Sequence, residues 1–101
     1  MNEHTNRILS KIFTMLNEFE NDKLDLNYLV TSLEGSINVL EEKLRPDFYE
    51  KWYLHWGELE QIRASVNEGL ITEEAGRKAA KISAKIVTHI VQFELGQMLD
   101  K

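Results

Sequence analysis

Apolar residues recur along most of the chain at spacings of three and four. Those spacings place the apolar side chains on one face of an α-helix, and the first stretch lacks the alternation that marks a strand. Four stretches show the pattern. Their apolar positions are Ile8, Leu9, Ile12, Phe13, Leu16 and Phe19; Leu26, Val30, Leu33, Ile37, Leu40 and Leu44; Phe48, Trp52, His55, Leu59, Ile62 and Val66; and Ala75, Ala79, Ile82, Ile86, Ile90 and Phe93, with Val87 and Val91 widening this last stripe. The pattern predicts four amphipathic helices.

Polar residues and a proline set the expected limits of the first two helices. Thr5 is a suitable N-cap for a helix over residues 6–20, because its hydroxyl can accept a hydrogen bond from a free N–H group of the first turn. Asp25 can cap the second helix in the same way. The ring of Pro46 disfavours helical backbone at the residue before it, so the second helix should end at Arg45.

The last two helices have similar signals. Asp47 is the expected N-cap of a third helix over residues 48–67. Gly69 is suited to a left-handed C-terminal cap. Thr72 is the expected N-cap of a fourth helix, which should run to about Leu99.

Four amphipathic helices with short connections bury their apolar faces most simply against one another. We therefore predict an all-α fold, an antiparallel up-down four-helix bundle that forms a single domain over residues 1–101. Its core is expected to depend on Leu33, Ile37, Trp52 and Ile86. On this placement the substitution Ile86→Ala should cost about 2 to 5 kcal/mol.

The composition fits this fold and excludes several classes of protein. The 101 residues are 43% hydrophobic and include a single proline, a balance typical of one globular domain with few turns. The chain has no cysteine, which excludes disulfides, thiol nucleophiles and thiolate metal sites. We see no secretory signal and no apolar run long enough to span a membrane. A cytoplasmic location and no membrane partner are therefore expected.

Charge is distributed unevenly along the chain. Residues 1–76 contain seven basic and 15 acidic residues, and residues 77–101 contain five basic and two acidic residues, for an overall net charge of −5. This acidity makes nucleic acid an unfavourable direct ligand. The basic cluster consists of Arg77, Lys78, Lys81 and Lys85. Two interpretations remain open: the halves attract one another within a solvated surface, or the acidic half steers a basic partner.

Catalytic and cofactor motifs are missing. A di-iron bundle needs Glu-x-x-His on two helices, and the nearest pattern here is the reversed His55-Trp56-Gly57-Glu58. Zinc-protease, phosphate-loop and dinucleotide motifs are also absent. We therefore predict no enzymatic activity, no cofactor and no metal or nucleotide dependence.

The histidines have structural explanations. His4 lies near the N-terminus, His55 falls on the apolar face of the third helix, and His89 lies at the edge of the fourth apolar stripe. A phosphotransfer histidine would need a nearby lysine and a small residue to admit its partner, and the residues around His89 lack that setting. Phosphotransfer is kept only as a third hypothesis.

Aromatic and acidic residues gather on the third helix, outside its expected core face. On a helical wheel Tyr49, Tyr53 and Trp56 lie about 60 to 120° from the centre of that face, beside Glu60. These rings could cover the flank of the bundle, or they could form a protein interface. The candidate partner-binding residues are Asp47, Tyr49, Glu50, Tyr53, Trp56, Glu58 and Glu60.

Two parts of the sequence resemble small helical bacterial immunity proteins, which include the partners of colicin-type and contact-dependent growth-inhibition toxins. The first is the run from Phe19 to Leu26. The second comprises Phe48, Trp52, Trp56, Leu59, Glu60, Ile62 and Ala64, followed by Leu70, Thr72, Glu73 and Glu74. The resemblance implies a helical bundle that binds one cognate toxin, often a nuclease, and blocks its active site or substrate surface.

The preferred hypothesis is a toxin-neutralising immunity protein. A nuclease must be basic where it holds nucleic acid, so an acidic inhibitor can compete as a phosphate mimic. The expected partner is thus a cognate protein toxin with a basic nuclease domain. The alternative is a structural or adaptor bundle that self-associates and has no enzymatic activity.

Overall fold

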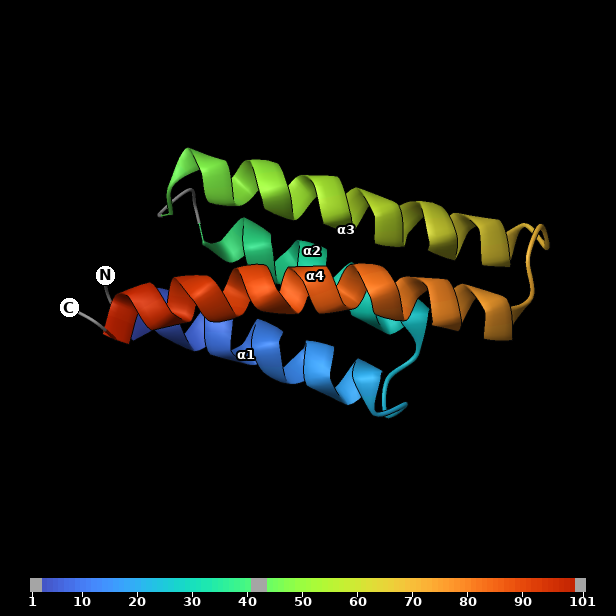
Figure 1. Cartoon of the computed structure of the whole chain (residues 1–101), viewed down its shortest axis with the longest axis horizontal. Coiled ribbons are helices and arrows are strands. Elements are labelled where there is room, and N and C mark those ends of the chain that lie inside the picture. Colours follow the sequence, from blue (N-terminus) through green and yellow to red (C-terminus); the bar gives the residue numbers. More distant parts are fainter. Residues whose placement is uncertain (1–2, 41–43, 100–101) are drawn as a thin grey trace.

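The computed structural model describes residues 3–40 and 44–99 of the chain, with side chains through Gly96 (Figure 1). The described residues form four helices and measure 45 × 24 × 18 Å. The helices are α1 (Glu3–Glu20), α2 (Leu26–Val39), α3 (Pro46–Asn67) and α4 (Glu73–Leu99).

The helices run alternately up and down, so that the start of α1 and the end of α4 lie at the same end of the molecule (Figure 1). Each helix packs beside its neighbours in sequence, and α1 packs against α4 to close the bundle. The predicted all-α, antiparallel four-helix bundle is therefore confirmed.

Three of the predicted helix caps are present. The Asp25 carboxylate accepts a hydrogen bond of 2.7 Å from the Tyr28 N–H group at the start of α2. The Thr72 hydroxyl accepts one of 3.1 Å from the Ala75 N–H group at the start of α4. Gly69 has a φ angle of +76° after the end of α3, as a left-handed cap requires.

Two other predicted caps are wrong. Thr5 is fully buried inside α1, which begins two residues earlier at Glu3. At α3 the N-cap is Arg45 and Asp47 belongs to the first turn, because Pro46 occupies the first helical position. A proline fits there, since its fixed φ angle is helical and its missing N–H group would have no partner in the helix.

Helix α2 ends at Val39, earlier than the prediction. The prediction that it continues over residues 41–43 falls outside the described residues. Leu44, the last position of the second apolar stripe, lies beyond the end of α2. It is nevertheless 8% exposed and belongs to the core.

The core contains the predicted Leu33, Ile37 and Trp52, each at most 2% exposed. Trp52 lies at 6.0 Å from Phe48, ring centroid to ring centroid, in a stacked arrangement. Its indole N–H group has no hydrogen-bond partner among the described residues. Other core side chains include Leu9, Ile12, Leu16, Phe19, Leu29, Val30, Leu40 and Leu59.

The predicted core face of α4 is wrong in its centre, because the widening positions Val87 and Val91 face the core and Ile82 and Ile86 do not. Ile82 is 69% exposed and Ile86 is 38% exposed, whereas Val87 and Val91 are completely buried. The estimate of 2 to 5 kcal/mol for Ile86→Ala therefore no longer holds, since this side chain is not enclosed by the core.

Small side chains on the other face of α4 explain the difference. Ala80 and Ala84 are at most 2% exposed, so the middle of the helix turns small residues inward. At Gly76 even a Cβ atom would clash with Val66 Cγ2 of α3. Close helix packing at these positions buries backbone and neighbouring side chains more completely than larger residues would allow.

Ion pairs also hold α4 in this rotation. Arg77 and Lys81 lie 3.2 and 3.0 Å from the carboxylate of Asp22, in the turn between α1 and α2. At the opposite end of α4, Arg45 pairs with the buried carboxylate of Glu94.

Candidate interaction site

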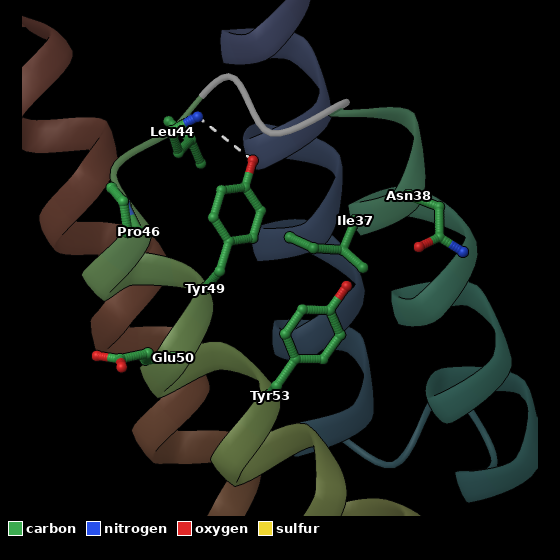
Figure 2. A pocket seen from close by; sticks show the side chains of 7 residues that line it. All are labelled: Ile37, Asn38, Leu44, Pro46, Tyr49, Glu50 and Tyr53. Atoms are coloured by element: carbon green, nitrogen blue, oxygen red, sulfur yellow. Dashed lines mark hydrogen bonds between the residues drawn. The ribbon is translucent and has the colours of Figure 1, made fainter.

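An open groove of about 890 Å³ lies between α2 and α3 (Figure 2). We call it the tyrosine groove. Its lining residues are Ile37, Asn38, Leu44, Pro46, Tyr49, Glu50 and Tyr53.

The two tyrosines lie one turn apart on α3; the Tyr49 ring points toward Leu44, and the Tyr53 ring points toward Ile37 of α2 (Figure 2). Tyr49 is anchored, because its hydroxyl accepts a hydrogen bond of 3.3 Å from the Leu44 N–H group. Its ring packs edge-on against Phe48 at 5.4 Å. Tyr53 is 48% exposed. The groove therefore presents one fixed aromatic ring and one that is accessible to a partner.

Glu50 and Pro46 form the outer edge of the groove. The Glu50 carboxylate extends away from the two tyrosine rings (Figure 2), and its residue is exposed. Ile37 and Leu44 belong to the core, so the floor of the groove is apolar. An apolar floor with a tyrosine and a carboxylate at the edge is a surface suited to a protein or peptide.

Trp56 and Glu60 follow the tyrosines along α3 but are engaged within the molecule. The Trp56 indole N–H group donates a hydrogen bond of 3.2 Å to the Val30 carbonyl of α2, and its ring lies edge-on at 6.5 Å from Tyr53. Glu60 pairs with Arg63 one turn later. The structure thus places Trp56 at the contact between α2 and α3, beside the groove, and Glu60 in an ion pair within α3.

Asp47 and Glu58 lie on the other side of α3, toward α4. Glu58 is 2.7 Å from the His55 ring and accepts a hydrogen bond of 3.4 Å from the Ser83 hydroxyl of α4. Asp47 lines a separate hollow between α3 and α4. Of the seven candidate partner-binding residues, Tyr49, Glu50 and Tyr53 share the tyrosine groove, and these two carboxylates do not.

Asn38 and Pro46 also line the groove, although neither was predicted as a site residue. A helical wheel shows which residues of α3 share a flank, but it does not show which neighbouring helix borders that flank. Pro46 could have indicated the neighbouring helix. It lies just before the aromatic residues of α3, so the connection from α2 reaches α3 beside them.

The basic cluster of α4 is divided. Arg77 and Lys81 are committed to Asp22, and Arg77 also donates a hydrogen bond of 2.8 Å to the Leu24 carbonyl. The hydrogen bond from Lys81 is the main reason that the pKa of Asp22 lies below its usual value. Lys78 and Lys85 are exposed. Part of the predicted attraction between the two halves of the chain is thus realised within the molecule.

Nothing in the described part of the chain groups three or more histidine or acidic residues in a way that could hold a metal ion. Within the same residues, no helix combines the length and the apolar character that a membrane span requires. No match was found when the chain was compared with models of protein families, with curated proteins and with solved structures.

Proposed function

We propose that this chain is a protein-binding module whose tyrosine groove binds a basic protein, and that it acts as a toxin-neutralising immunity protein in the cytoplasm. The observation that carries the proposal is the half-exposed ring of Tyr53 at the edge of an open groove with an apolar floor. The sequence resemblance to helical immunity proteins supports the choice of a toxin as partner.

The groove supplies two kinds of interaction. Tyr53 offers a large ring with few rotatable bonds, and such rings contribute much of the binding energy at protein interfaces when a partner covers them. Tyr49 needs little ordering on binding, because the Leu44 N–H group already holds its hydroxyl. Glu50 adds a negative charge at the edge, where it attracts a basic partner before contact.

A nuclease is the toxin class that fits this chemistry best. Its nucleic-acid site must carry positive charge, and an acidic protein with net charge −5 can occupy that site in place of phosphates. Neutralisation would then follow from blocking the substrate surface.

The test uses a toxin encoded directly beside the gene for this chain. Co-expression should restore growth to cells that produce the toxin, and the two proteins should purify as a complex. Growth that stays arrested, together with the absence of a complex, would overturn the immunity proposal.

Binding kinetics then locate the surface. Tyr53→Ala should raise the dissociation rate by about tenfold or more, because it removes a ring that loses water on contact. Glu50→Lys should slow association, and the effect should shrink when salt shortens the range of the field.

Glu20→Lys is the matched control, since it makes the same charge change at an exposed residue of α1. Circular dichroism of each variant should match that of the parent chain. If Tyr53→Ala and Glu50→Lys bind like the parent, the tyrosine groove is not the docking surface.

A further inference from the structure

A second apolar surface runs along α4, on the face that solvent reaches. We call it the α4 seam. Three of its side chains are large and exposed: Ile82 at 69%, Phe93 at 58% and Ile86 at 38%. The positions of the seam are Ala75, Ala79, Ile82, Ile86, His89 and Phe93.

These positions follow one another at spacings that alternate between four and three. That alternation is the pattern by which two helices pack along a shared seam, and it spans 19 residues, or about 27 Å of helix. It is therefore long enough for five turns of a partner helix. A hollow of about 360 Å³ beside it, between α3 and α4, is lined in part by Ile86, His89 and Phe93.

Lysines flank the seam on one side, and charges of both signs flank it on the other. Lys78 and Lys85 are exposed on the side away from α3. The α3 side carries the acidic Asp47 and Glu58 and the basic Arg45 and Lys51. Glu58 lies level with Ser83 of α4, since their side chains are 3.4 Å apart, and thus about half a turn from the level of Lys85.

We propose that the α4 seam binds a second copy of this chain, with the two α4 helices parallel and related by a two-fold axis. A parallel two-fold pair places unlike sides of the seam against each other, so that Lys85 of one copy faces Glu58 of the other. An antiparallel pair would instead place lysine against lysine. The repulsion between lysines disfavours the antiparallel arrangement, and the pairing of Lys85 with Glu58 favours the parallel one.

His89 is the single polar position of the seam. In the parallel pair it meets His89 of the second copy, and a polar residue at such a position costs stability while it fixes the register of the helices. His89→Leu should therefore tighten association. This inference is independent of the tyrosine groove, which lies on the α2 side of α3.

The first experiment measures the mass of the full chain by sedimentation over a range of protein concentrations. The parent chain should pass from monomer to dimer, and Ile82→Glu should raise the dissociation constant by at least about tenfold. Leu70→Glu is the matched control, because Leu70 is 72% exposed but lies outside the seam. A parent chain that is monomeric throughout, or an equal effect of both variants, would overturn the proposal.

The second experiment tests the orientation of the two α4 helices. Because the chain has no cysteine, an introduced cysteine is the only thiol that can form a disulfide. Ala75→Cys and His89→Cys should each form a disulfide-linked dimer on mild oxidation, because equivalent positions meet in a parallel pair. An antiparallel pair about Ile82 would crosslink only when the two variants are mixed. Crosslinks in the mixture alone, or none at all, would contradict the proposed arrangement.

Discussion

The two apolar faces of α4 differ in the size of their side chains. Hydrophobicity alone would bury the face with the larger side chains, but the structure buries the other one. The face toward the core is made of small residues, among them Gly76, Ala80 and Ala84, together with Val87. The face toward solvent contains the larger Ile82, Ile86 and Phe93. Small residues let α4 approach its neighbours closely, so the packing of the whole bundle, and not the size of each side chain, decides which face is buried.

The largest expected effect comes from placing a charge on each face. Val87→Asp would put an unpaired carboxylate into the core, at a cost of several kcal/mol, which is a large part of the stability of a small domain. Ile82→Asp changes an exposed position and should leave the monomer folded. Urea unfolding followed by circular dichroism checks both variants. If Ile82→Asp is the variant that unfolds, the rotation of α4 is the one predicted from the sequence.

Substitutions by alanine should distinguish the two faces by a smaller difference in unfolding free energy. Val87→Ala should cost about 2 kcal/mol and Ile86→Ala about 1 kcal/mol, although the second substitution removes more atoms. The reason is that Val87 is enclosed and Ile86 is 38% exposed. Unfolding midpoints at a protein concentration that keeps the chain monomeric provide the measurement. The reverse order would contradict the burial of Val87.

The smallest effect concerns the ion pairs that hold α4 in its rotation. Asp22→Asn should lower the unfolding free energy at neutral pH, because the lowered pKa of Asp22 reflects stabilising bonds from Lys81 and Arg77. That contribution is complete above about pH 4 and is lost as the pH falls through the lowered pKa. Asparagine tolerates the positive φ angle of 61° at this position.

The measurement for Asp22→Asn is the difference in urea midpoint between variant and parent at pH 7 and in acid. The difference should shrink in acid and in high salt. Glu20→Gln removes the charge of a neighbouring exposed residue and is the control for a charge change outside these ion pairs. A pH-independent difference would mean that the ion pairs do not hold α4.

The elements of the fold could be predicted from local signals. The Asp25 and Thr72 caps and the positive φ angle of Gly69 depend on nearby residues, and the sequence contains them. The rotation of α4 could not be predicted in this way, since both of its faces are apolar. The correct face is defined by Gly76 against Val66, a contact between different helices.

Only part of the candidate site could be predicted from the sequence. The wheel correctly placed Tyr49, Tyr53 and Trp56 together on one flank of α3, but charge density grouped Glu58 with them. The same wheel places Glu58 about 200° from Trp56, so the angle on the wheel, and not closeness in sequence, separates this carboxylate from the aromatic flank. The part contributed by Asn38 of α2 required the arrangement of two helices in space.

The two tryptophans give the molecule two intrinsic optical probes with different surroundings. Trp52 is completely buried and its indole N–H group has no partner among the described residues, so its fluorescence should be blue-shifted and should change mainly when the core unfolds. Trp56 lies beside Tyr53 and bonds to Val30, so its emission should respond when a ligand covers the tyrosine groove. In a Trp56→Phe variant only Trp52 of the core would emit as a tryptophan. The difference between the emission spectra of the parent chain and this variant would then report binding without an attached label.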